Sequence, residues 1–98
     1  MIMATFIALV NFTDQGIRNV KDSPDRLNAF KSLADKLGAT VKAAYYTVGE
    51  YDLVTIVEGS EEAATALLLK VASLGNVRTQ TLRAFSPDDM KRILGLMS

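Results

Sequence analysis

The side chains best suited to chemistry gather in one short stretch of this sequence. The chain has no histidine and no cysteine, so the usual general base, the usual thiolate nucleophile and the best transition-metal ligands are absent. Catalysis would have to use Asp, Glu, Lys, Arg or Tyr. The densest group of these types is Tyr45, Tyr46, Tyr51 and Asp52. A carboxylate with phenols nearby can hold a small polar ligand, so these four are the first candidate ligand-binding residues.

A structural role is the alternative for the same group. Asp52 would then accept hydrogen bonds from the turn or from Thr47, while the tyrosines fill the core and an interface. Arg83 is a further candidate, and it falls inside an expected strand rather than a loop. A cation in that position needs a carboxylate partner. Asp52 and Glu50 are expected at the same end of the sheet, and we predict an ion pair with Asp52 first.

A second polar group is expected at the end of the sheet opposite the tyrosines. Asn11 closes the first expected strand, Arg18 and Lys21 follow in a polar connector, and Glu58 ends another strand. Arg18 and Lys21 suit an anionic ligand. Ordinary solvated loop residues are the alternative.

Several classes of partner are not supported. The six glycines form no G-x-G-x-x-G or Walker pattern, so we expect no nucleotide and no other cofactor. The acidic group Glu58, Glu61 and Glu62 is better explained by a strand end and a helix N-terminus than by a metal site. Eleven basic and eleven acidic residues cancel, which favours neither nucleic acid nor an anionic membrane. With no signal-like or membrane-spanning segment in the sequence, we expect a cytoplasmic protein.

The tyrosine stretch itself is predicted to be a β-hairpin. Two β-rich runs, 40–48 and 51–58, meet at Gly49-Glu50, and a Gly-X pair suits a type II′ turn because glycine takes a positive φ readily. Counting outward from this turn gives the register: Val48 faces Tyr51, Thr47 faces Asp52, Tyr46 faces Leu53 and Tyr45 faces Val54.

The rest of the chain supplies the other elements. A strand is expected over 4–12 and another over 76–85. Helices are expected from Ser23 to a stop at Gly38, and from Ser60 to a stop at Gly75, because each has an N-cap residue, an apolar stripe and a terminal glycine. A C-terminal helix begins at Ser86 and carries the apolar stripe Met90, Ile93, Leu94 and Met97.

This order, βαββαβ followed by a helix, predicts one α+β domain over residues 1–98. It is the ferredoxin-like arrangement, a four-stranded antiparallel sheet in the order 4-1-3-2. The first and third strands are apolar on both alternating faces, as central strands should be. Two helices cover only one face, so a second copy packed sheet to sheet is expected to cover the other, giving a homodimer. The C-terminal helix is the alternative cover.

Three segments of the sequence also resemble a known protein family. The segments ATFIALVNFTDQGIRNVKDSPDR, YYTVGEYDLVTIVEG and ATALLLKVASLGNVRTQTLRAF resemble the GYD-domain family, small bacterial and archaeal proteins named for the residues that match Gly49, Tyr51 and Asp52 here. The resemblance implies a dimeric α+β barrel. It implies no catalytic residues, because the family is largely uncharacterised.

A weaker likeness links the hairpin to the effector-binding domain of Lrp/AsnC regulators, although this chain lacks their DNA-binding helix-turn-helix. The leading functional hypothesis is an oligomeric module that binds a small polar or anionic metabolite without catalysis. The alternatives are a cofactor-independent enzyme of the dimeric α+β barrel type and a structural interaction module.

Overall fold

The computed structural model describes residues 3–98 and shows a sheet with two helices on one side. The elements in chain order are β1 (Ala4–Phe12), α1 (Asp14–Arg18), the 3₁₀ helix η1 (Val20–Asp22), α2 (Ser23–Leu37), β2 (Thr40–Tyr46), β3 (Leu53–Gly59), α3 (Glu61–Ser73), β4 (Val77–Ala84) and α4 (Pro87–Gly95).

The four strands form one antiparallel sheet in the order β2-β3-β1-β4. This is the predicted ferredoxin-like order, and the two strands predicted to be central, β1 and β3, are central. Along them Phe6 pairs with Val57 and Ile7 pairs with Ile56. Because side chains alternate along a strand, these two neighbouring pairs lie on opposite faces of the sheet.

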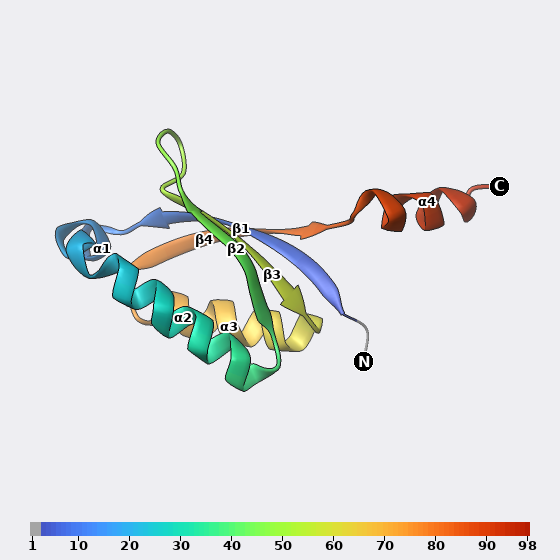
Figure 1. Ribbon diagram of the computed structural model, residues 1–98. Helices are drawn as coiled ribbons and strands as arrows, with labels where there is room; N and C mark the ends of the chain where they lie inside the picture. The colour runs from blue at the N-terminus through green and yellow to red at the C-terminus, as the bar shows by residue number, and fades with distance from the viewer. Residues whose placement is uncertain (1–2) are drawn as a thin grey trace.

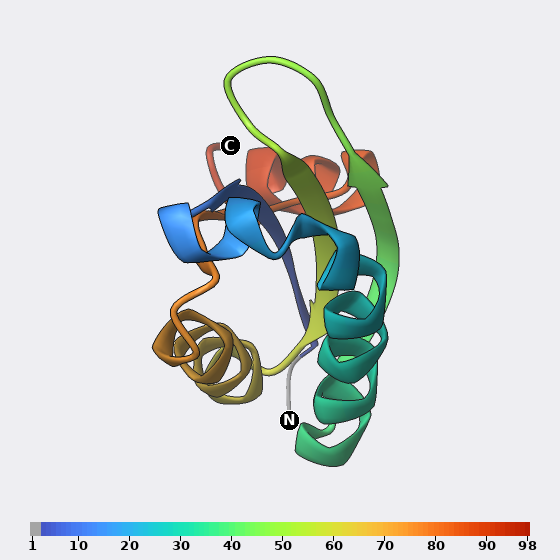
Figure 2. The same cartoon turned by 90° about the vertical axis from the view of Figure 1, so that its left-hand side faces the viewer.

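Helices α2 and α3 cover the face that carries Val57 (Figures 1 and 2). Val57 and Leu67 are fully buried there, together with Ala34 of α2. The other face, which we call the open face, carries Ile7 and Leu9 of β1 and Val54 and Ile56 of β3, all half-buried within the single chain. Within residues 3–98, no helix lies over this face of the sheet (Figure 1).

The predicted helix boundaries hold with one shift. Helix α2 ends at Gly38, whose φ of 83° is left-handed, and α3 begins after Ser60, whose side chain accepts a 3.1 Å hydrogen bond from the Ala63 N–H. Ser23 was expected to be the N-cap of α2, but it is the first residue of the helix and Asp22 takes the cap position. The Ser23 side chain is buried, and its hydroxyl forms a hydrogen bond with that of Tyr46.

The hairpin keeps the predicted register from Thr47 and Asp52 into the strands, but it forms neither the predicted Val48–Tyr51 pair nor the predicted turn. Tyr45 pairs with Val54 and Tyr46 with Leu53, and the Thr47 N–H donates a 2.9 Å hydrogen bond to the Asp52 carbonyl. Beyond that bond the chain opens into a loop over 47–52, in place of a two-residue turn. Gly49 does take a positive φ, 135°. The loop rises on the side of the sheet away from α2 and α3 (Figure 1).

Helix α4 extends away from the rest of the molecule (Figure 1). The longest dimension is therefore 52 Å and the radius of gyration 14.6 Å, against about 13 Å for a compact domain of this length. Met90 and Leu94 of this helix are exposed, and so is Met97, which lies two residues past its end. The alternative in which the C-terminal helix covers the open face is wrong for the single chain.

Candidate functional site

The side chain of Asp52 is held by backbone groups at the end of β1. Its Oδ2 accepts a 2.8 Å hydrogen bond from the Phe12 N–H, while its own N–H donates at 2.9 Å to the Val10 carbonyl. The carboxylate thus accepts the Phe12 hydrogen bond that a backbone carbonyl of a neighbouring strand would ordinarily accept, one residue before β3 begins. Asp52 therefore has the structural role given as the alternative: its carbonyl accepts from Thr47, as expected, while its carboxylate accepts from Phe12, which was not expected.

Arg83 does not pair with Asp52, and that prediction was wrong. Strand β4 runs antiparallel to β1, so Arg83 lies opposite Phe6 near the start of β1, whereas Asp52 lies at its end. The guanidinium of Arg83 sits 5.6 Å from the ring centre of Phe6 and 4.5 Å from that of Phe85, and it donates a 3.2 Å hydrogen bond to the Thr5 carbonyl. Aromatic faces and a carbonyl therefore accommodate this cation instead of a carboxylate.

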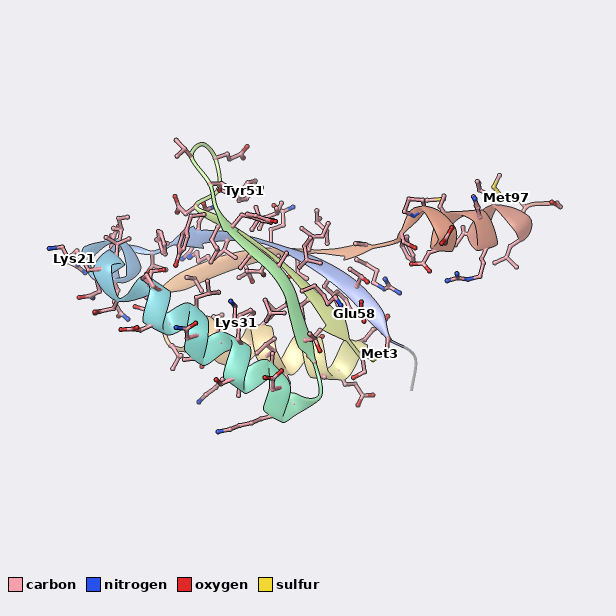
Figure 3. The ribbon with its side chains drawn as sticks, viewed as in Figure 1. Met3, Lys21, Lys31, Tyr51, Glu58 and Met97 are labelled. Atoms are coloured by element: carbon pink, nitrogen blue, oxygen red, sulfur yellow. The ribbon has the colours of Figure 1, made fainter. Side chains whose placement is uncertain are left out.

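The three tyrosines do not converge on one site. Tyr46 lies on the helix-covered face, where its hydroxyl is 2.9 Å from that of Ser23. Tyr51 reaches from the loop across to β4 and donates a 2.9 Å hydrogen bond to Gln80 Oε1; it lies above the open face in Figure 3. Tyr45 alternates with Tyr46 along β2 and is 67% exposed. The three hydroxyl groups therefore lie in three different environments and do not form one binding site.

Asn11, Arg18 and Lys21 lie at the same end of the sheet as the hairpin loop, not at the opposite end as predicted. Asn11 is next to Val10, which pairs with Leu53. Glu58 pairs with Thr5 and lies at the other end, as the labels Lys21 and Glu58 in Figure 3 show. Arg18 and Lys21 are exposed.

The connector that carries these two cations is fastened to the turn before β4. The Thr13 N–H donates to the Asn76 carbonyl at 3.0 Å, and Gln15 Nε2 donates to Asn76 Oδ1 at 3.0 Å. Gly16 packs so closely that a Cβ built there would lie 1.9 Å from the Asn76 carbonyl oxygen. The connector and the turn before β4 are therefore held together by hydrogen bonds and close packing, and they also form a polar surface.

A cavity lies between the sheet and the two helices, and none of its lining residues is among the candidates named from the sequence. It has a volume of about 180 Å³ and is lined mainly by apolar side chains of β1, β3, α2 and α3. Thr55 is part of the lining; it is 2% exposed, and its hydroxyl has no hydrogen-bond partner. One feature of the sequence could have indicated the cavity: Ala8, a small side chain, and Thr55, a polar one, pair in the middle of two otherwise apolar strands.

Over residues 3–98 no group of three or more Asp and Glu side chains is placed to hold a metal ion. The pKa of the Asp89 carboxyl group is lowered from its usual value, first by a hydrogen bond from the Ser86 N–H and then by Arg92. That residue caps α4. In the same part of the chain, no helix has the length and apolar character needed to cross a membrane.

Comparison with known proteins gives the same family as the sequence motifs. The model of the GYD domain matches residues 6–94. A curated relative from Thermus thermophilus, called a glutamine synthetase and cystathionine beta-lyase binding protein, is 37% identical over 90 residues, which cover 90% of this chain and 95% of the relative. The resemblance in the sequence is thus confirmed, and the chain belongs to the GYD-domain family.

Proposed function

We propose that this chain is a protein-binding module that works as a homo-oligomer. The observation that carries the proposal is the amount of apolar surface that the single chain leaves uncovered, on the open face and on α4. The name of the relative points the same way, since it describes a protein that binds two enzymes.

The open face suits a second copy of the chain. Its centre is formed by aliphatic side chains of β1 and β3, with Leu82 of β4, 43% exposed, beside them. When a sheet packs on an identical sheet through a two-fold axis, the same patch is buried on both partners. One contact would therefore remove the apolar open face of both copies from water. The homodimer predicted from the sequence rests on this face.

Helix α4 suits a different partner. Met90 and Leu94 are 44% and 53% exposed, Met97 just past the helix is 80% exposed, and the opposite side of the helix carries charges. An amphipathic helix of this kind fits into an apolar groove of another protein. Flexible methionines adapt to grooves of different shape, which is what binding two unrelated enzymes would require.

Two substitutions test the two surfaces separately. Ile56→Glu places a charge on the open face, and Leu94→Glu places one on the apolar side of α4. We expect light scattering to give a dimer mass for wild type and Leu94→Glu and a monomer mass for Ile56→Glu. In biolayer interferometry with glutamine synthetase and cystathionine beta-lyase from the source organism, Leu94→Glu should weaken binding at least tenfold, a loss of about 1.4 kcal/mol.

Lys91→Glu is the matched control, because it introduces the same side chain on the charged side of α4. It should bind both enzymes within about threefold of wild type, a difference below about 1 kcal/mol. A wild-type protein that binds neither enzyme more tightly than it binds serum albumin would refute the proposed function. A monomeric Leu94→Glu would instead assign α4 to the interface between copies.

Binding of a small polar or anionic metabolite remains a second prediction. Arg18 and Lys21 are exposed on neighbouring helical turns, and Asn11 is at the same end of the sheet. Asp52 is a weaker candidate than its sequence position indicated, since one of its oxygens is engaged by Phe12. A thermal-shift measurement with glutamate and phosphate on wild type and Arg18→Ala tests this prediction.

A further inference from the structure

We propose that the cavity between the sheet and helices α2 and α3 binds a small, uncharged, mainly apolar molecule that carries one hydroxyl or carbonyl group, and that Thr55 forms the hydrogen bond to that group. This site is distinct from the two proposed protein-binding surfaces, because its lining comes from α2, α3 and the sheet residues that face them. Figure 2 shows these two helices on one side of the sheet.

The size and lining of the cavity decide the class of ligand. Ala8 and Leu53 contribute to the sheet side, Phe30 and Leu33 come from α2, and Leu68 comes from α3. The volume of about 180 Å³ exceeds the roughly 150 Å³ of an engineered apolar cavity that admits benzene. A single aromatic ring or a short branched aliphatic molecule is therefore the right size.

The unpaired hydroxyl of Thr55 is the reason to expect one polar group on the ligand. Its side chain is 2% exposed, and its hydroxyl is the buried side-chain polar atom left without a partner among the described residues. Leaving such a group unpaired costs free energy, which a ligand hydroxyl or carbonyl would recover. Rotation about χ1 moves the Thr55 hydroxyl between staggered positions, so the hydroxyl can turn toward a bound molecule.

The charges around the cavity argue against a cationic ligand. Its lining includes Arg26 and Lys70 and no carboxylate. The Arg26 guanidinium donates to the Asn19 carbonyl at 2.9 Å and to the Gly16 carbonyl at 3.4 Å, so it is held against the α1 connector. Ser23, one of the other hydroxyl side chains in the lining, is already bonded to Tyr46. An uncharged molecule needs no further charge compensation from this set.

Phenol and toluene are matched probes, because they share the ring and differ in one hydroxyl group. Each is titrated into the ¹⁵N-labelled protein while the amide signals of Ala8, Leu53 and Leu68 are followed. We expect both probes to shift these signals in a saturable way. In Thr55→Val, which keeps the side-chain shape, the affinity of phenol relative to toluene should fall about five- to tenfold, the effect of one hydrogen bond. Thr55→Ser, which keeps the hydroxyl, should leave that ratio within about twofold.

Ala8→Leu tests the location, because the larger side chain occupies part of the cavity; both probes should then lose saturable binding. If wild type shows no saturable shifts at the cavity with either probe, the proposed site is refuted. An unchanged phenol-to-toluene ratio in Thr55→Val would overturn the role given to Thr55. So would a thermal midpoint of Thr55→Val below that of wild type, since it would mean that the hydroxyl has a partner within the fold.

Discussion

The side-chain carboxylate of Asp52 accepts a 2.8 Å hydrogen bond from the backbone N–H of Phe12. Next to it, the Asp52 N–H donates to the Val10 carbonyl at 2.9 Å. The two contacts extend the pairing of β1 with β3 beyond Leu53, where the backbone of β3 turns away into the loop. An aspartate that looked suited to ligand binding thus completes the sheet.

Removing this carboxylate should destabilise the fold. Asp52→Ala leaves the Phe12 N–H without its acceptor, and we expect the free energy of unfolding to fall by about 1–3 kcal/mol. Asp52→Asn keeps an acceptor oxygen at the same place and should lose less than half as much. Glu50→Ala, in the exposed part of the same loop, should be neutral within about 0.5 kcal/mol. Urea unfolding followed by circular dichroism measures all three, and equal losses for Asp52→Ala and Glu50→Ala would contradict the structural role.

The elements of the fold follow from local signals in the sequence. Gly38 and Gly75 end their helices with φ values of 83° and 86°, and Ser60 and Ser86 begin theirs as capping residues. These signals depend on a few neighbouring residues, so they can be read without the tertiary structure. The strand order followed from hydrophobicity on both faces of β1 and β3, which only central strands need.

The candidate site was predicted less well, for two reasons. Arg83 was placed beside Asp52, although the predicted antiparallel topology already puts the end of β4 at the start of β1; the error lay in relating the two ends of the sheet. The cavity beside Thr55 has a different origin. Its volume depends on how far apart α2 and α3 lie, and no local pattern encodes that separation.

Gly16 should be intolerant of any side chain. A Cβ at this position would lie 1.9 Å from the Asn76 carbonyl oxygen, so Gly16→Ala must push apart the connector and the turn before β4. We expect a loss of about 3 kcal/mol in the free energy of unfolding. Gly95→Ala is the control, since no atom lies within 4 Å of the corresponding Cβ; it should stay within about 1 kcal/mol of wild type. Equal thermal midpoints for the two variants would show that the close approach is not maintained in solution.

The hydroxyl pair of Ser23 and Tyr46 should contribute to stability despite the exposure of the tyrosine. Ser23 is 5% exposed and its hydroxyl lies 2.9 Å from that of Tyr46. Tyr46→Phe should therefore cost about 1 kcal/mol, whereas Tyr45→Phe, at a side chain 67% exposed, should cost almost nothing. A double-mutant cycle with Ser23→Ala isolates the pair, and we expect a coupling of about 1 kcal/mol. A coupling near zero would mean that water replaces Tyr46 as the partner of Ser23.

Helix α4 should lose its N-terminal turn in acid. The Ser86 N–H, followed by Arg92, holds the pKa of Asp89 below its usual value of 3.8. A carboxyl group whose pKa is lower in the folded state stabilises that state above the unfolded pKa, and the contribution disappears as the pH falls through the folded pKa. Amide chemical shifts of α4 should therefore move toward coil values below pH 3.8. Asp89→Asn, which cannot titrate, should remove this transition, whereas Asp88→Asn, one residue away and outside the Ser86 capping box, should preserve it. An acid transition that survives in Asp89→Asn would assign the effect to another carboxyl group.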